Sequence, residues 1–294
     1  MESCTLVIPC FNEAARLEVD RYEAALRTRP WLSFLFVNDG STDRTADVLR
    51  AFAARFPSVV AALNLPKNVG KAEAVRAGMN AALDGGAAIT GFWDADLATP
   101  FEELDRFLAI LNERERVSVV FGSRVQLLGR EIARSPLRHY LGRVFATAAS
   151  LALGLPVYDT QCGAKLFRVV PETRELFAEP FLSRWIFDVE ILARLVRRRI
   201  ATSGPAVTQS VYEMPLNSWC DVRGSKVKPF DFVRAAAELV RIRRRYLRGV
   251  PARAALITTP STAAAPTAAT TAATTAAKTG STTVAIRAGG DVVA

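Results

Sequence analysis

The sequence has little of what most metal centres and disulfide frameworks are built from. Its 294 residues include one histidine and four cysteines, and no two cysteines form a Cys-x-x-Cys pair. A zinc site is therefore not expected. Cys4 and Cys10 lie on or beside an apolar run, which fits packed thiols. No signal peptide pattern follows Met1, so we expect a reducing, cytoplasmic location.

Two further absences disfavour two classes of protein. No apolar run reaches the roughly 18 residues that a membrane-spanning helix needs, and the nearest approach, 144–157, is too short. No Gly-x-Gly-x-x-Gly fingerprint follows the first expected strand. We therefore expect neither a membrane-spanning helix nor a dinucleotide-binding fold of the dehydrogenase type.

What the sequence does have is an excess of positive charge. The chain carries 38 Lys and Arg residues against 29 Asp and Glu residues, a formal net charge of +9. This balance favours phosphates, nucleic acid or anionic lipid as partners, and a basic surface kept for solubility is the alternative. Nucleic acid is not expected, because we expect no exposed aromatic residues interleaved with the arginines.

The two ends of the chain differ in composition. Residues 251–294 include 26 Ala and Thr among 44 residues and no aromatic residue, so we expect a disordered tail there. Residues 1–250 are then the folded domain. In its first half, β-rich runs alternate with amphipathic stretches. The expected strands are 5–9, 31–37, 59–65, 88–93 and 117–122, and the expected helices run from an Asn12 cap to residue 26, then over 42–56, 71–83 and 101–112.

This order predicts an α/β fold with a mostly parallel, doubly wound sheet and helices on both faces. Ligands bind such sheets beyond the carboxyl ends of the strands, and polar residues follow every expected strand. Asp94 and Asp96 follow the fourth. Residues i and i+2 of an extended segment point the same way, so the pair can hold a hard divalent cation, Mg²⁺ or Mn²⁺. The alternative is that Asp96 caps the next helix.

Two other polar residues at strand ends have two interpretations each. Asp39 belongs either to a turn that caps the following helix or to a nucleotide site, where its carboxylate would reach ribose hydroxyls or a base edge. Lys71 is either an ordinary exposed lysine of a first helical turn or a cation that covers a phosphate.

Four segments at these strand ends resemble the GT-A domain of inverting family 2 glycosyltransferases. They are 9–13 (Pro-Cys-Phe-Asn-Glu), 38–43 (Asn-Asp-Gly-Ser-Thr-Asp), 68–71 (Asn-Val-Gly-Lys) and 94–96 (Asp-Ala-Asp). Three later segments are more specific, and they are similar to dolichyl-phosphate β-glucosyltransferases and other polyprenyl-phosphate hexosyltransferases. They are 159–167 (Asp-Thr-Gln-Cys-Gly-Ala-Lys-Leu-Phe), 184–190 (Arg-Trp-Ile-Phe-Asp-Val-Glu), and Trp219 with 224–226 (Gly-Ser-Lys).

The resemblance covers about residues 3–235 and departs from the usual pattern at Asn38, Ala72 and Ala164. It implies a UDP-sugar donor, UDP-glucose in the first place, bound by residues 1–125. It also implies that Asp94 and Asp96 hold the metal ion that neutralises the departing diphosphate. The donor-binding residues that it implies are Pro9, Phe11, Glu13, Asp39, Lys71 and Asp94.

The acceptor implied by the resemblance is a polyprenyl phosphate, bound by residues 126–250 together with Arg124. A phosphate is largely dianionic at neutral pH, so it needs cations rather than a strong general base. Arg124, Arg138 and Lys226 are the expected phosphate ligands, and Arg124 counts among the catalytic residues. Attack from the face opposite the leaving UDP inverts the anomeric configuration.

Further acidic and polar residues are expected to shape this pocket, namely Asp159, Gln161, Lys165 and Glu190. For Asp159 the alternative is a buried ion pair with a nearby arginine. Asp188 is counted with the catalytic residues as a positioning group, and a helix over 187–199 would point Asp188 and Glu190 in different directions. A soluble family 2 enzyme with a small-molecule, glycan or protein hydroxyl acceptor is the alternative function, with Asp188 or Glu190 as its base. A non-catalytic nucleotide-sugar sensor is disfavoured by the intact aspartate pair.

A soluble chain must also reach its lipid. We expect a peripheral location on the cytoplasmic face of an anionic membrane. The arginines at 194 and 197–199 predict one basic helical face, and those within 241–248 predict a second. The apolar stretch 144–155 could lie in the membrane interface. The alternative is a solvated basic surface over a buried core helix.

Overall fold

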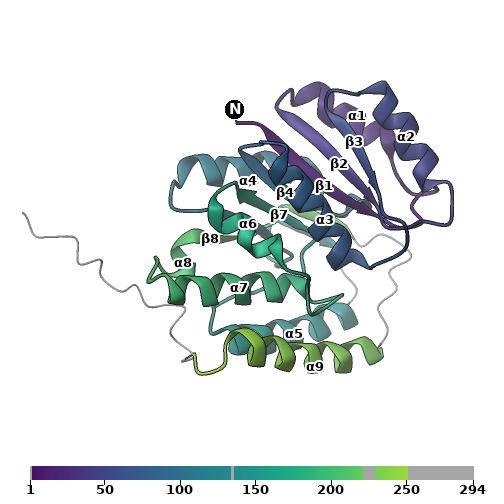
Figure 1. Cartoon of the computed structure of the whole chain (residues 1–294). Coiled ribbons are helices and arrows are strands. Elements are labelled where there is room, and N and C mark those ends of the chain that lie inside the picture. The colour runs from purple at the N-terminus through teal and green to yellow at the C-terminus, as the bar shows by residue number, and fades with distance from the viewer. Residues whose placement is uncertain (1, 134–135, 221–228, 251–294) are drawn as a thin grey trace, which may run out of the picture. The chain divides into compact units, whose positions relative to one another are not determined.

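A computed structural model of the chain describes residues 2–133, 136–220 and 229–250 (Figure 1). The tail expected over 251–294 and the expected phosphate ligand Lys226 lie outside these residues. Arg138 lies on a described helix, but its side chain is not among the described parts.

A seven-stranded sheet organises this part of the chain, with the strand order β3-β2-β1-β4-β7-β5-β8. Neighbouring strands are parallel except at β7, which runs antiparallel to both β4 and β5. Two shorter strands, β6 and β9, pair with each other. The bounds are β1 Cys4–Cys10, β2 Leu32–Asn38, β3 Val60–Asn64, β4 Ile89–Trp93, β5 Val119–Ser123, β6 Glu131–Ala133, β7 Ala164–Arg168, β8 Val211–Pro215 and β9 Ser218–Cys220. The mostly parallel sheet predicted from the sequence is confirmed.

Both halves of the domain contribute to this sheet. β7 comes from the second half and lies between β4 and β5, so that Lys165 pairs with Phe92 on one side and Phe121 on the other. Because β7 is antiparallel, it begins at the edge where β4 and β5 end. The residues that precede β7 are therefore brought next to Asp94.

Helices cover both faces of the sheet, and alternate strand residues enter two hydrophobic cores. Val7 and Phe92 pack with helices α3, α5, α6, α7 and α9 on one face. Leu6 and Phe34 pack with α1, α2 and α4 on the other. The helix bounds are α1 Val19–Thr28, α2 Thr45–Arg55, α3 Lys71–Asp84, α4 Glu102–Glu113, α5 Pro136–Leu153, α6 Pro171–Ala178, α7 Phe187–Ala201, α8 Val207–Ser210 and α9 Pro229–Tyr246.

The expectation of a helix that begins at Asn12 is wrong. Asn12 has a φ of 55°, outside the helical region, and α1 begins at Val19. The Asn12 side chain instead accepts a hydrogen bond of 2.9 Å from the Thr42 backbone N–H. Asn12 therefore joins the loop after β1 to the loop after β2, and residues 11–18 remain available at the carboxyl edge of the sheet.

Helices α5, α7 and α9 pack against one another and form the layer below the sheet in the view of Figure 1. Their surface corrects the expectation of two basic faces. Arg194 is buried and donates to the carbonyl oxygens of Leu176, Glu179 and Pro180. Arg198 pairs with Glu172 and Glu175, and Arg199 pairs with Glu172. Three of the four α7 arginines are thus committed within the protein.

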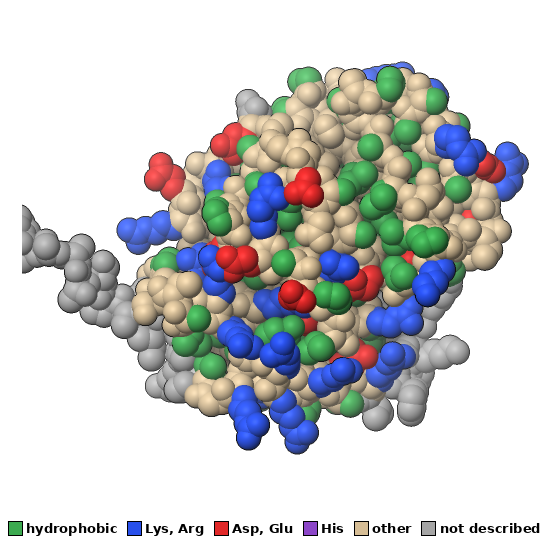
Figure 2. Space-filling view, viewed as in Figure 1, with side chains coloured by type: hydrophobic (Ala, Val, Ile, Leu, Met, Phe, Trp, Pro, Cys, Tyr) green, Lys and Arg blue, Asp and Glu red, His purple; other side chains and the backbone are tan. Residues whose placement is uncertain are grey.

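Arginines at the end of α9 remain at the surface: Arg241 and Arg244 are exposed on the helix, and Arg248 is exposed just after it. Lys and Arg side chains gather over α7 and α9 in Figure 2. Within the described ranges, no helix combines the length and the apolarity that crossing a membrane requires.

Candidate active site

Asp94 and Asp96 lie at the carboxyl edge of the sheet, directly after β4, and both side chains are half-buried. The Asp94 backbone N–H donates to the Gly163 carbonyl oxygen at 3.0 Å, just before β7. A Cβ atom on Gly163 would come within 1.8 Å of the Asp94 carboxylate. Residue 163 must therefore be glycine for Asp94 to occupy this position.

The capping interpretation of Asp96 does not hold. Its carboxylate accepts a hydrogen bond of 3.1 Å from the Ala98 N–H, whereas Phe101 is the N-cap residue of α4 and no side chain caps it. The Asp96 carboxylate thus closes a local turn and keeps further lone pairs for a ligand.

The two carboxylates repel each other. Desolvation and then the nearby Asp94 charge raise the pKa of Asp96. Lys71 neutralises part of this negative charge, with its Nζ atom 2.5 Å from Asp94 Oδ1. Desolvation opposes the charge on Lys71, but Asp94, Asp188 and Asp96 together outweigh it and raise the Lys71 pKa. The site therefore has an excess of negative charge that a cation would relieve.

A divalent cation fits the residues that are present. Across the described residues, no group of three or more His, Cys, Asp and Glu side chains is placed to hold a metal. Asp94 and Asp96 would then be the protein ligands, and water and diphosphate oxygens would complete the shell, as Mg²⁺ tolerates. Carboxylate oxygens suit Mg²⁺ and Mn²⁺ rather than softer metals.

Asp39 connects the end of β2 to the start of α3. Its buried carboxylate accepts hydrogen bonds from the Val69 N–H at 2.7 Å and the Gly70 N–H at 2.9 Å. The Asn68 side chain adds a third at 3.1 Å. Asp39 therefore fixes the loop that carries Lys71, and its direct contact with a nucleotide stays a prediction.

The remaining donor-binding residues predicted from the sequence, Pro9, Phe11 and Glu13, lie at the same edge. Pro9 is on β1, and Phe11 and Glu13 follow it in the 11–18 loop, all half-buried. The Glu13 N–H donates to the Thr45 hydroxyl at 2.9 Å, and its carboxylate pairs with Arg16 at 2.6 Å. The loop is thus held on the side of the first two strands.

Arg124 follows β5 and is held by the carboxylate of Asp159. Its Nε donates to Asp159 Oδ2 at 2.6 Å and its Nη2 donates to Oδ1 at 2.9 Å. The guanidinium also lies over the Trp219 ring, 5.3 Å from its centroid. Burial works against the charge, but Asp159 outweighs burial and the pKa of Arg124 is raised. The ion pair offered as the alternative for Asp159 is present, and Gln161 joins it through an N–H donated to Asp159 at 3.0 Å.

Known proteins resemble this chain in sequence and in fold. The profile of glycosyl transferase family 2 matches residues 5–172. The chain belongs to glycosyl transferase family 2. A dolichyl-phosphate beta-glucosyltransferase of Trichomonas vaginalis, ALG5C, is 35% identical over 251 residues, which cover 81% of this chain and 70% of that protein. The dolichyl-phosphate beta-glucosyltransferase of Dictyostelium discoideum is 32% identical over 261 residues, covering 84% and 75%.

Solved structures agree on the fold. Glucosyl-3-phosphoglycerate synthase from Mycobacterium tuberculosis, crystallised with Mn²⁺, UDP-glucose and phosphoglyceric acid, matches with a TM-score of 0.57. The match covers 85% of this chain and 81% of that one at 17% identity. At that identity the likeness is one of fold, and it supports the GT-A architecture predicted from the sequence.

Within this family 2 fold, Lys165 and Asp188 form a buried ion pair of 2.5 Å beneath the site. The Lys165 ammonium also donates to the carbonyl oxygens of Thr160 and Cys162, at 3.1 and 2.6 Å. Burial raises the pKa of Asp188, against the lowering effect of Lys165 and Lys71. Asp188 thus lies near the charges of Lys71 and Asp94 but is already paired with Lys165.

Glu190 points away from Asp188, as predicted. Its fully buried carboxylate accepts hydrogen bonds from the Leu182 N–H at 2.8 Å and from the Tyr246 hydroxyl at 2.8 Å, and it pairs with Arg194 at 2.8 Å. It can shape the pocket only through this packing. The structure argues against Glu190 as a general base.

One residue that the sequence did not single out is Glu213, on β8. Its carboxylate accepts hydrogen bonds from the backbone of Tyr158 and Asp159. The only local signal is a carboxylate inside an otherwise apolar strand, Val-Tyr-Glu-Met-Pro.

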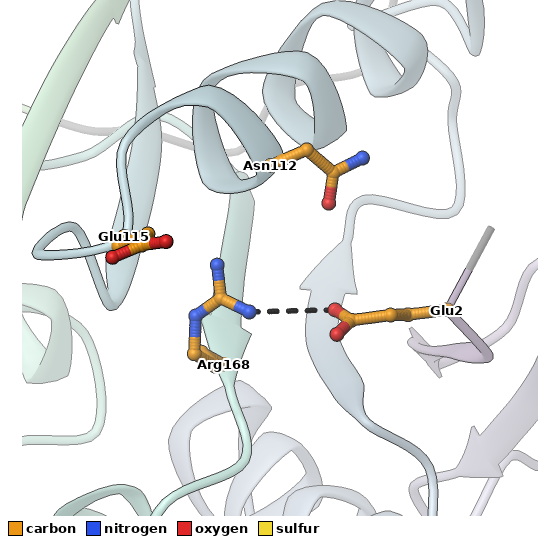
Figure 3. A pocket seen from close by; sticks show the side chains of 4 residues that line it. All are labelled: Glu2, Asn112, Glu115 and Arg168. Atoms are coloured by element: carbon orange, nitrogen blue, oxygen red, sulfur yellow. Dashed lines mark hydrogen bonds and ion pairs between the residues drawn. The ribbon is translucent and has the colours of Figure 1, made fainter.

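A polar pocket also lies at the opposite edge of the sheet, and Figure 3 shows Arg168 there between Glu2 and Glu115. Arg168 is the last residue of β7 and pairs with Ile89, the first residue of β4. This pocket is therefore separated from Asp94 by the length of a strand, and we do not assign it to the active site.

Proposed function

We propose that this glycosyltransferase transfers a hexose, glucose in the first place, from a UDP-sugar to a polyprenyl phosphate with inversion at the anomeric carbon. The relatives named as dolichyl-phosphate beta-glucosyltransferases support this acceptor. The observation that carries the proposal is the hydrogen bonding of the Arg124 guanidinium. Asp159 holds one edge of the guanidinium, and among the described residues nothing accepts a hydrogen bond from Nη1. A fixed guanidinium with an available edge suits phosphate oxygens.

The donor side supports a nucleoside diphosphate. Asp94 and Asp96 would hold Mg²⁺ or Mn²⁺, which would neutralise charge on the leaving diphosphate. Lys71, now paired with Asp94, would add a second positive charge beside that leaving group. The absence of a side chain at Gly163 leaves the space that the Asp94 carboxylate occupies.

The acceptor side supports a phosphate rather than a hydroxyl. A hydroxyl acceptor needs a base at the site, and the two candidates are poorly suited to that role. Glu190 is fully buried, and its carboxylate is already bonded to the Leu182 N–H, the Tyr246 hydroxyl and Arg194. Asp188 is 5% exposed and paired with Lys165. A phosphate dianion is its own nucleophile and needs only to be oriented by cations.

A peripheral membrane contact is part of the proposal. The outer face of α5 exposes Tyr140, Val144 and Leu151, with 70%, 70% and 72% of each residue accessible. Their spacing of four and seven residues places them on one stripe. The adjacent α9 exposes Arg241 and Arg244, and Arg248 is exposed just after its end. An apolar stripe beside a basic row is the pattern of a helix pair that lies on anionic lipid.

The test incubates the purified full chain with Mg²⁺ or Mn²⁺, labelled UDP-sugars and a short polyprenyl phosphate. We expect label in the organic phase, most from UDP-glucose, and its loss with Asp96→Ala. The matched control is Asp84→Ala, because Asp84 is an exposed aspartate paired only with Arg174 among described contacts. Hydrolysis of the donor without any lipid product, or transfer only to water-soluble hydroxyl acceptors, would overturn the proposal.

A further inference from the structure

Lys165 and Glu213 carry opposite charges and lie on the same face of the sheet, on the two strands that flank Phe121. Phe121 pairs with Lys165 of β7 and with Glu213 of β8. Residues opposite one another in adjacent strands point to the same face. The Lys165 ammonium lies 5.8 Å from the Phe121 ring centroid. Lys165 and Glu213 therefore flank one aromatic ring beneath the segment that leads into β7.

Each charge holds one end of that segment, residues 158–163. Glu213 accepts hydrogen bonds from the Tyr158 N–H at 2.8 Å and from the Asp159 N–H at 2.6 Å. Lys165 donates to the carbonyl oxygens of Thr160 and Cys162. The carboxylate thus binds the amide groups at the start of the segment, and the ammonium binds the carbonyl groups nearer its end.

The segment carries the side chain that orients Arg124. Asp159 accepts three hydrogen bonds from Arg124, from its backbone N–H at 3.1 Å and from Nε and Nη2. Because the Asp159 N–H is held by Glu213, the position of the Asp159 carboxylate depends on Glu213. The Arg124 guanidinium, between Asp159 and the Trp219 ring, depends on it in turn.

We propose that Glu213 is a positioning residue of the acceptor site, which fixes Asp159 by its backbone amide and thereby aims Arg124 at the acceptor phosphate. Glu213 touches no substrate in this assignment. The inference rests on the proposed function, because it needs a phosphate acceptor at Arg124. Burial raises the pKa of Glu213, and the two amide donors oppose that shift.

The test substitutes Glu213→Gln in the full chain. The amide keeps the shape of the side chain, but it replaces a charged acceptor with a neutral one and turns an NH₂ group toward the Tyr158 N–H, which bonds to both carboxylate oxygens in the wild type. We expect the KM for the short polyprenyl phosphate to rise roughly tenfold, with the KM for UDP-glucose and kcat changed less than about twofold. The matched control is Glu175→Gln, since Glu175 lies on α6 and pairs with Arg198.

A double-mutant cycle separates positioning from general stability. If Glu213 acts through Asp159, then Glu213→Gln adds little to the acceptor KM of the Asp159→Asn variant. Additive effects, or equal changes in the two KM values, would overturn the inference. Should Glu213→Gln fail to fold, Glu213→Asp carries the same test, because it keeps the charge but shortens the reach by one methylene.

The wild-type chain distinguishes the two proposals. A wild type that forms no lipid product contradicts the proposed function. A wild type that forms product, together with a Glu213 variant whose acceptor KM is unchanged, contradicts only the role of Glu213.

Discussion

The proposed donor side of the site (Asp94, Asp96 and Lys71) and the proposed acceptor side (Arg124, Asp159 and Trp219) use charge in different ways. On the donor side the carboxylates are half-buried, and Asp96 is bonded to a single backbone amide among the contacts described above. On the acceptor side Arg124 makes three hydrogen bonds to one carboxylate and stacks on an indole. The difference indicates that the donor side depends on a ligand to balance its charge, whereas the acceptor side is ordered by the protein itself.

Removing a donor-side carboxylate is expected to have the largest effect. Asp96→Asn should lower kcat/KM for transfer about a thousandfold, because a metal ion contributes several kcal/mol of charge stabilisation to the transition state. The free energy of unfolding should hold or rise, because desolvation and Asp94 already disfavour the Asp96 charge. Chelation of the wild type by EDTA should reproduce the loss, and added Mg²⁺ or Mn²⁺ should restore only the wild type. Full activity of the chelated wild type would contradict the metal assignment.

Changing the acceptor-side cation should have a smaller effect of another kind. Arg124→Lys keeps the charge but loses the two-pronged contact with Asp159, so we expect a loss on the order of a hundredfold in kcat/KM for the lipid phosphate. Unlike Asp96→Asn, it should also lower the melting temperature, since Asp159 is left partly unpaired in a buried place. Arg114→Lys is the matched control, because Arg114 likewise lies over an aromatic ring, that of Tyr212. An unchanged acceptor KM would remove Arg124 from the acceptor site.

A third change acts on the boundary between the two sides. Gly163→Ala places a Cβ atom against the Asp94 carboxylate, and we expect about 2 kcal/mol of destabilisation by overpacking together with a tenfold loss of donor affinity. Gly85→Ala is the control, because Gly85 has a φ of −72° and no atom closer than 3.4 Å to the added Cβ. Urea unfolding and a UDP-binding titration measure the two effects. A Gly163→Ala variant as stable as the wild type would show that Asp94 can move freely.

The two sides also differ in how far the sequence predicts them. Asp94 and Asp96 directly follow a strand that a local run of apolar residues predicts. The rule that ligands bind beyond the carboxyl ends of the strands therefore finds them. The Arg124–Asp159 contact joins residues 35 positions apart, and it exists because β7 inserts between β4 and β5. Periodicity in the first half of the chain carries no information about that insertion.

The contacts of Glu213 are even harder to predict from the sequence. Its partners are backbone amides of Tyr158 and Asp159, which have no residue-type signature. The arginines of α7 show the opposite error. Their spacing predicts a basic surface, but Glu172 and Glu175 of α6 neutralise Arg198 and Arg199 through a tertiary contact, and burial removes Arg194 from the surface.

The smallest expected effects concern the membrane contact, where basic and apolar residues should respond differently to salt. Arg244→Gln should lower partitioning onto anionic liposomes about fivefold at low salt, since each basic residue near the surface contributes roughly 1 kcal/mol. The effect should vanish at high salt. Leu151→Ser should lower partitioning at both salt concentrations, because the apolar contribution is not screened.

Arg50→Gln is the control for this comparison. Arg50 is exposed on α2, on the face of the sheet away from α5 and α9, and pairs with Asp47. Its partitioning should match that of the wild type. Because the short polyprenyl phosphate used in detergent needs no membrane, Arg244→Gln and Leu151→Ser should both retain full turnover with it. A loss of turnover there would place these residues in the acceptor site, and unchanged partitioning of both variants would assign the membrane contact to another surface.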